Sequence, residues 1–261
     1  MQPSTGPGPV LSTLNLLALD TSTERLALAL QAPGGPYTVL AEGGARASAT
    51  LLPQVHALMA LAGLTLARLD AIAFGCGPGA FTGLRTACSV AQGLAFGLGK
   101  PLLAIDSLLI VAEDARRQHY ADAARLDIAV AMDARMDEAY AGRYRWSNGA
   151  WQTLQAARLY ALPALSQVWA HTADAAPVQA VAGSALAAFA DRLPWPTAAL
   201  QIPQECDRAV ALLGLAVQAA RAGEGVDPAL ALPIYLRDKV AQTTQERDAA
   251  RAAATAAVVL P

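Results

Sequence analysis

Three glycines at alternating positions open the stretch of this sequence that is best suited to binding a phosphate group. Residues 75–100 read GCGPGAFTGLRTACSVAQGLAFGLGK, with Gly75, Gly77 and Gly79 ahead of an expected helix of small and apolar residues. Glycine allows backbone N–H groups to approach an anion at the start of a helix. Glycines that serve only close packing of the chain explain these residues equally well, so the pattern alone leaves both interpretations open.

The nearby Gly99-Lys100 pair does not belong to a P-loop. That loop needs a glycine five residues before the Gly-Lys pair and a serine or threonine after the lysine. This chain has Leu94 and Pro101 at those positions. The sequence also lacks the Gly-x-Ser-x-Gly elbow that presents a catalytic serine in many hydrolases. Neither of these two enzyme signatures is therefore present.

A dinucleotide-binding fingerprint is a closer match to the glycine stretch. Gly75-x-Gly77-x-x-Ala80 follows an expected strand and precedes a helix, and the next strand ends in Asp106, where a ribose-binding acid could sit. Against this interpretation, Pro78 lies inside the turn, and three antiparallel strands are expected where such folds usually begin with a βαβ unit. A nucleotide-binding enzyme of the oxidoreductase type therefore stands as an alternative function.

Three acidic residues close together are the remaining candidates for acid–base chemistry. Asp133, Asp137 and Glu138 surround Arg135, and a pair of carboxylates can act as general acid and general base. These residues fall at an expected strand–turn–strand corner, where solvation of the turn and local ion pairs account for them. We therefore expect them to have no catalytic role.

The cysteines and histidines show no metal-binding spacing. The three cysteines are Cys76, Cys88 and Cys206, and the three histidines are His56, His119 and His171. An odd number of cysteines without metal spacing is typical of a reducing cytoplasm, which is where we expect the protein to be. Each cysteine is expected to be a small buried residue, and His56 is expected to lie on a helix surface. We expect no bound metal.

Composition and charge limit the partners that the chain is expected to have. The 261 residues are 54% hydrophobic and carry a net charge of −2, whereas a protein that binds nucleic acid by itself usually shows a basic face. No unbroken apolar run reaches the roughly 18 residues that suggest a membrane span. Residues 1–13 lack the positive start of a signal peptide and are expected to form a flexible leader, and residues 238–261 a peripheral tail.

Two sets of alternating elements must position these candidate residues. The first half is expected to contain strands at 14–20, 25–31, 37–41, 69–75 and 100–106, and helices at 48–64, from the glycine loop to about 98, and at 107–120, the last capped by Ser107. The second half is expected to contain strands at 126–133, 138–146, 151–155 and 177–184, a turn at Asn148-Gly149, and helices after residue 184 and at about 205–222. This pattern predicts two related α/β subdomains with mixed sheets, residues 14–110 and 111–237, with helix 205–222 able to pack back on the first.

Four segments together resemble one known family. LALDTST (17–23), the glycine stretch, DARMDEAYAGRY (133–144) and PIYLR (233–237) follow one another in this order. Over residues 14–240 the chain resembles the TsaB (YeaZ) family, a subunit of the bacterial machinery that makes threonylcarbamoyladenosine on tRNA, and residues 77–85 are the most specific part. The resemblance implies the actin-like ATPase (ASKHA) fold, in which an acid and a small polar turn between the first two strands face nucleotide phosphate.

The fold resemblance points to candidate nucleotide-binding residues. Asp20 and Ser22 would occupy the turn between the first two strands, with the glycine loop of Gly75, Gly77 and Gly79 nearby. An ordinary polar hairpin turn explains Asp20 and Ser22 equally well. Beside the oxidoreductase, an active ATPase of the actin-like fold is therefore an alternative function.

The role that the resemblance implies is non-catalytic. TsaB pairs with TsaD, a paralogue that carries the transferase site and holds a metal with a His-x-x-x-His pair on its first helix, and works beside TsaE. The matching segment here has no such pair: it has Ala47 where many TsaB chains keep a histidine, and His56 lies too far along to substitute. The chain is thus expected to require no cofactor of its own, with ATP or ADP possible at the partner interface, and to meet tRNA only through the complex.

Two helices are expected to form the partner interface. The resemblance implies that TsaB and TsaD meet through equivalent helices, and that TsaB alone can form a similar homodimer. Apolar residues at helical spacing mark one stripe on each helix: Leu51, Val55, Leu58 and Met59 on the first, and Ala91, Leu94, Ala95 and Leu98 on the second. Both stripes could instead face the chain's own sheet, and apolar coverage beyond one face would distinguish docking from packing.

Overall fold

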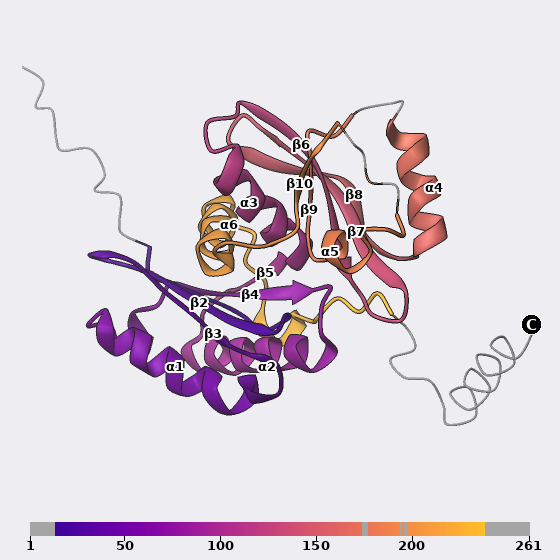
Figure 1. Cartoon of the computed structure of the whole chain (residues 1–261). Coiled ribbons are helices and arrows are strands. Elements are labelled where there is room, and N and C mark those ends of the chain that lie inside the picture. Colours follow the sequence, from indigo (N-terminus) through magenta and orange to yellow (C-terminus); the bar gives the residue numbers. More distant parts are fainter. Residues whose placement is uncertain (1–13, 174–176, 194, 196–197, 238–261) are drawn as a thin grey trace, which may run out of the picture.

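The protein contains two five-stranded mixed sheets with helices between them and on their outer faces (Figure 1). The computed structural model describes residues 14–173, 177–193, 195 and 198–237. The leader 1–13 and the tail 238–261 expected from the sequence lie outside these residues. Within the described part, no helix is both long and apolar enough to cross a bilayer.

The first sheet is built from the first half of the chain. Its strands are β1 (Leu16–Asp20), β2 (Arg25–Ala32), β3 (Gly35–Glu42), β4 (Ala71–Gly77) and β5 (Leu102–Asp106). They lie in the order β3-β2-β1-β4-β5; the first three are antiparallel neighbours, and β4 and β5 run parallel to β1. The antiparallel opening expected from the sequence is confirmed.

The second sheet repeats this arrangement. Its strands are β6 (Arg125–Asp133), β7 (Glu138–Ser147), β8 (Ala150–Ala161), β9 (Ala180–Ala182) and β10 (Leu200–Ile202). Read from the other edge, the order β8-β7-β6-β9-β10 matches that of the first sheet, again with an antiparallel meander followed by two parallel strands. The expected pair of related subdomains, each with a mixed sheet, is confirmed.

The helices form three layers around the sheets (Figure 1). Helices α1 (Ala47–Leu61) and α2 (Phe81–Leu98) cover the outer face of the first sheet, and α4 (Leu162–Ala173) and α5 (Ala185–Ala188) cover the outer face of the second. Helices α3 (Ser107–His119) and α6 (Arg208–Ala222) lie between the two sheets. Short 3₁₀ helices span Gly44–Arg46, Leu66–Arg68 and Pro228–Leu230.

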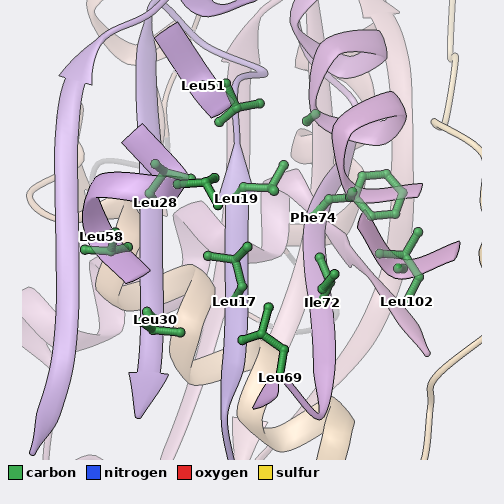
Figure 2. Close-up of a cluster of buried hydrophobic side chains, with 14 of the residues drawn as sticks. Leu17, Leu19, Leu28, Leu30, Leu51, Leu58, Leu69, Ile72, Phe74 and Leu102 are labelled. Carbon is green, nitrogen blue, oxygen red and sulfur yellow. The ribbon is translucent and has the colours of Figure 1, made fainter. Parts of the chain in front are cut away.

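The central strand β1 is buried on both faces, which explains its apolar sequence. Leu17 and Leu19 pack into the cluster beneath α1 and α2, where Figure 2 shows them beside leucines of β2. Leu16 and Ala18 pack on the opposite face, against α6. Successive side chains of a strand point to opposite faces, so a strand between two helix layers is apolar at consecutive positions. Asp20 ends this run at the edge of the sheet.

Several local features differ from the expectations. Asp106, rather than Ser107, caps α3, because its carboxylate accepts hydrogen bonds from the backbone N–H groups of Leu108 and Leu109, at 2.8 and 3.4 Å. The expected subdomain boundary after residue 110 falls inside α3. Helix α4 and the three-residue strand β10 were not expected. Helix α6 packs against β1 and β2 of the first sheet and against α3.

Candidate functional site

A cleft of about 980 Å³ lies between the two subdomains. Its wall on the first subdomain includes the β1–β2 turn, the start of α2 and the start of α3. Its wall on the second includes the turn after β6, the N-cap and last residues of α5, and the segment that leads into α6. Ligand pockets occur preferentially at such junctions, so this cleft is where a nucleotide expected from the fold would have to lie.

The candidate acid at the floor of the cleft is paired within the protein. Asp20 is fully buried, and its Oδ2 accepts a hydrogen bond from Nη2 of Arg208, the first residue of α6, at 3.1 Å. The same guanidinium donates to Oγ of Ser22 at 3.1 Å, and its Nη1 pairs with Glu205. The other oxygen of Asp20 accepts from the backbone N–H of Ser22. A ligand in the cleft would thus have to displace Arg208 to reach this carboxylate.

The glycines of the loop make room for other parts of the chain. A Cβ atom at Gly75 would lie 1.9 Å from Oδ2 of Asp20, and one at Gly79 would lie 2.7 Å from the Cβ of Ser22. Gly77 has a φ of +115°, and a Cβ there would lie 2.7 Å from the carbonyl oxygen of Ile234. The structure therefore brings all the candidate nucleotide-binding residues together, but each of the three glycines is required by close packing of protein atoms.

A fourth glycine that sequence reasoning missed belongs to the same contact. A Cβ at Gly83, in the first turn of α2, would lie 1.8 Å from the carbonyl oxygen of Thr21. The hydroxyl of Thr21 donates a hydrogen bond to the carbonyl oxygen of Gly83 at 2.7 Å. The backbone N–H of Ala80 donates one to the carbonyl oxygen of Ser22 at 2.8 Å. The start of α2 is thus bonded directly to the β1–β2 turn. The only signal in the sequence was a glycine inside an expected helix, where glycine costs about 1 kcal/mol relative to alanine.

Burial and neighbouring charges shift the pKa values of two buried groups next to the cleft, Arg208 and Asp106. Burial alone would lower the pKa of Arg208, but Asp20 and Glu205 raise it above its usual value, so the guanidinium stays charged. Burial raises the pKa of Asp106, although the Tyr144 hydroxyl donates a 2.7 Å hydrogen bond to it. This bond connects β5 of the first sheet to β7 of the second.

Two of the three cysteines are buried as expected, and the third is not. Cys76 and Cys88 are buried free thiols, whereas Cys206 is exposed. Burial, with the nearby carboxylates of Asp106 and Asp20, raises the pKa of Cys76 to about 12. A thiol with so high a pKa is a poor nucleophile at neutral pH. Cys206 is exposed because it lies at the protein surface in the segment before α6 and not in a hydrophobic core.

The acidic residues at the β6–β7 turn are engaged in ion pairs, as expected. Asp137 pairs with Arg192 at 2.7 Å, Asp133 with Arg135 at 3.5 Å, and Glu138 with Arg237. His56 is exposed on α1, as expected. Among the described residues, no group of three or more histidine, cysteine or acidic side chains is placed to hold a metal ion.

The predicted partner interface is wrong for most of its residues. Six of the eight are buried in the core between the two helices and the first sheet: Leu51, Val55, Leu58, Met59, Ala91 and Ala95. Leu94 and Leu98 are partly buried against the same core. The stripe with the strongest helical periodicity is the one that each helix uses to cover its own sheet, so those side chains are not available to a partner.

Apolar residues outside the buried stripe of each helix are exposed to solvent. On α2 they lie on the side opposite the sheet, whereas on α1 they lie on the two flanks of the buried stripe, because residues 52 and 61 are half a helical turn apart. Leu52 and Leu61 on α1 are 41% and 71% exposed, and Phe96 on α2 is 75% exposed. A Cβ atom at Gly93 or Gly97 of α2 would have no atom within 4 Å. Two interior helix glycines that serve no contact within the chain are unfavourable by about 1 kcal/mol each. We call Gly93, Phe96 and Gly97 of α2 the outer helix face.

Comparisons with known proteins identify relatives of this chain. The model of the family described as "TsaD: tRNA N6-adenosine threonylcarbamoyltransferase" matches residues 42–259. The chain is 40% identical to the TsaB protein of Haemophilus influenzae over 130 residues, which is 50% of this chain and 53% of that protein. It is 34% identical to TsaB of Escherichia coli over 139 residues, or 53% and 58% of the two chains. The matched region spans just over half the length of these curated relatives.

Solved structures extend the similarity over most of the chain. The structure described as YeaZ from Pseudomonas aeruginosa is 39% identical, with a TM-score of 0.73, and the match covers 85% of this chain and 100% of that one. A second structure, described as an uncharacterized protein with similarity to peptidase YeaZ from Pseudomonas aeruginosa, is also 39% identical, with a TM-score of 0.75 over 86% and 100% of the two chains.

Proposed function

We propose, from the premise that this chain belongs to the TsaD protein family and to its YeaZ (TsaB) members, that it is a non-catalytic subunit in the synthesis of threonylcarbamoyladenosine on tRNA. Its direct partner would be TsaD, which would carry the transferase site. TsaE and tRNA would meet the chain in the assembled complex, and the site of action would be the cytoplasm. The sequence match to proteins named for this biosynthesis and the match to the family described as a tRNA threonylcarbamoyltransferase both support a role in this tRNA modification.

The non-catalytic role is supported by the way in which the chain uses its candidate reactive groups. Asp20 is neutralised by Arg208, and the acids of the β6–β7 turn are engaged in ion pairs. Catalytic acids and bases need a pKa tuned to their task and access to substrate. The buried Asp20, with its permanent cationic partner, has neither. Each acid of the β6–β7 turn is paired with an arginine, so these groups are better explained as parts of the fold.

The outer helix face is the proposed site of contact with TsaD. Its phenylalanine, Phe96, offers apolar area that the chain does not bury itself. Its glycines keep the surface of α2 low beside that side chain, which allows another helix to approach closely. The unneeded glycines, Gly93 and Gly97, are the observation that carries this proposal, because neither packing nor a positive φ requires glycine at these positions. The same face would form the homodimer of the isolated chain.

Nucleotide binding by the free chain is proposed to be weak or absent. The guanidinium of Arg208 lies against the acid that would face a phosphate, and the glycine loop is filled by Asp20, Ser22 and Ile234. ATP or ADP would then bind, if at all, at the interface with TsaD. The alternative of a nucleotide-binding enzyme, either an oxidoreductase or an active ATPase, makes the opposite prediction. Submicromolar binding of NAD or ATP to the free chain, or rapid ATP turnover, would support it.

The test is a binding titration of TsaD from the same organism against variants of the outer helix face. Phe96→Glu replaces an exposed side chain, and Gly93→Leu adds a side chain where no atom of the protein lies within 4 Å. Both variants should therefore melt near the wild-type temperature. Each should weaken TsaD binding roughly a hundredfold, since every 1.4 kcal/mol is a factor of ten. Leu154→Glu is the matched control, because Leu154 is also a partly exposed leucine but lies on β8. Wild-type affinity in both test variants would contradict the proposed face.

A further inference from the structure

The segment after the last 3₁₀ helix crosses the cleft between the subdomains. Residues 231–237 run from beside α2 to the lower end of β7 and β8, and Figure 1 shows them in yellow. Both Ile234 and Tyr235 line the cleft, as does Arg237. The segment belongs to no strand or helix itself and is held by individual contacts, so those contacts determine what it does.

The first part of the segment is bonded to the first subdomain. The side-chain amide of Gln92 on α2 donates a hydrogen bond to the carbonyl oxygen of Ala231 at 2.8 Å. The backbone N–H of Ile234 donates one to the carbonyl oxygen of Cys76, in β4, at 2.7 Å. The ring of Tyr235 packs on that of Phe81, with centroids 5.1 Å apart, and its hydroxyl accepts from Arg85 Nε at 3.1 Å. These contacts fix the segment to the end of β4 and to α2.

The last described residue is bonded to the second subdomain. The guanidinium of Arg237 donates to the backbone carbonyl oxygens of Ala134 and Arg135, at 2.9 and 3.2 Å, and forms an ion pair with Glu138. The side chains of this ion pair are only 13% and 30% exposed, so water screens it less than a surface pair. One arginine thus joins the segment to both sides of the β6–β7 turn.

The turn that Arg237 holds has an unfavourable backbone. Arg135, Met136 and Asp137 have φ angles of +64°, +58° and +59°. Each non-glycine residue in the left-handed region costs of order 1 kcal/mol or more and persists where surrounding contacts impose it. The carbonyl oxygens that accept from Arg237 lie at the start of this run. The contact with the crossing segment is therefore one of those that keep the turn in this conformation.

We propose that residues 231–237 are a strap that fixes the separation of the two subdomains across the cleft, with Arg237 as its anchor on the second subdomain. The strap acts together with the hydrogen bond from Tyr144 of β7 to Asp106 of β5, which also connects the two sheets. The cleft then keeps one width in the free chain, with no ligand needed to close it. Because Tyr235 packs on Phe81 and accepts a hydrogen bond from Arg85 in the first turns of α2, the strap also couples the width of the cleft to the position of that helix.

The experiment measures the cleft width directly in the isolated chain. Spin labels are attached at Arg25→Cys and Ala188→Cys, which line opposite walls of the cleft, in a Cys206→Ser background. The two remaining cysteines are buried. The strap predicts one narrow distance distribution, and a broader distribution with a longer mean when Arg237→Gln is added. Arg192→Gln is the matched control, because Arg192 pairs with Asp137 on the same turn but from within the second subdomain; it should leave the distribution unchanged.

Hydrogen exchange on the unlabelled chain gives an independent readout. In Arg237→Gln, the amide of Ile234 and those of the β6–β7 turn should lose protection, whereas Arg192→Gln should affect only the turn. Tyr235→Ala removes the contact with Phe81 at the end of the strap that is bound to the first subdomain, and it should widen the distance distribution in the same way. This variant replaces Arg237→Gln in the experiment if Arg237→Gln does not fold. A distribution as narrow in Arg237→Gln or in Tyr235→Ala as in the wild-type chain, with the Ile234 amide still protected, would overturn the proposal.

Discussion

Replacing Arg208 with methionine tests whether the cleft floor is a structural ion pair or a ligand site. Arg208→Met keeps much of the apolar stem but leaves the Asp20 carboxylate, which is fully buried, without its cation. Removing one partner of a buried pair costs about 3–5 kcal/mol, because the remaining charge is uncompensated. This is a large part of the roughly 5–15 kcal/mol by which a typical domain is stable. At about 2–4 °C per kcal/mol for a chain of this size, the melting temperature should fall by roughly 6–20 °C.

The assay is urea unfolding at pH 7 together with a thermal melt, with two companion variants. Arg46→Met breaks an ion pair with Glu42 whose side chains are 74% and 76% exposed, and exposed pairs contribute only about 0–1 kcal/mol. Asp20→Asn combined with Arg208→Met removes the uncompensated charge and should recover part of the loss. If Arg208→Met were as stable as Arg46→Met, Asp20 would not depend on Arg208, and the argument against a nucleotide at this carboxylate would fail.

Three further perturbations follow from burial and charge. Ala91→Glu places a carboxylate in the core beneath α2 and should cost several kcal/mol or prevent folding, whereas Ser89→Glu on the exposed side of the same helix should melt near the wild-type temperature. Burial would raise the pKa of Glu113, but hydrogen bonds from Arg116 and Trp151 hold it below its usual value. Its stabilisation is therefore fully present above about pH 4.5 and is lost as the pH falls through the lowered pKa, so the stability difference between wild type and Glu113→Gln in urea titrations should shrink below pH 4.5. Of the three thiols, only Cys206 should react with a thiol reagent in the native chain at pH 8, and two or more equivalents consumed before unfolding would contradict the described burial.

The sequence predicted most of the fold because its signals are local. Hydrophobic runs and turn residues placed the strands of the first sheet, and β6, β7 and β9 of the second, to within a few residues. The Asn148-Gly149 hairpin between β7 and β8 is confirmed by the positive φ angles of both residues. Helix α4 and strand β10 lie where the local signal is weak: a proline follows the first residue of α4, and β10 has only three residues. The repeated strand order in the two halves was the feature that predicted two related subdomains.

The site was harder to predict because its contacts connect distant parts of the chain. Asp20 and Arg208 are 188 positions apart, so the sequence showed an acid at a turn but not the cation that neutralises it. Most of the residues expected at the partner interface are buried, and the sequence missed this for a different reason. A helix that covers its own sheet and a helix that docks on a partner show the same 3.6-residue period, so periodicity selected the buried stripe. The outer helix face appears only when exposure is known.

The most direct test of the proposed function is a reconstituted transfer reaction. The purified chain is mixed with tRNA and threonylcarbamoyl-adenylate, first alone and then with TsaD and TsaE from the same organism, and threonylcarbamoyladenosine is measured by mass spectrometry of the digested tRNA. We predict no modified base with the chain alone, and a yield with TsaD and TsaE that depends on adding the chain and falls when Phe96→Glu replaces it. Modified base formed by the chain alone, or a yield from TsaD and TsaE that is the same with and without the chain, would contradict the proposed role.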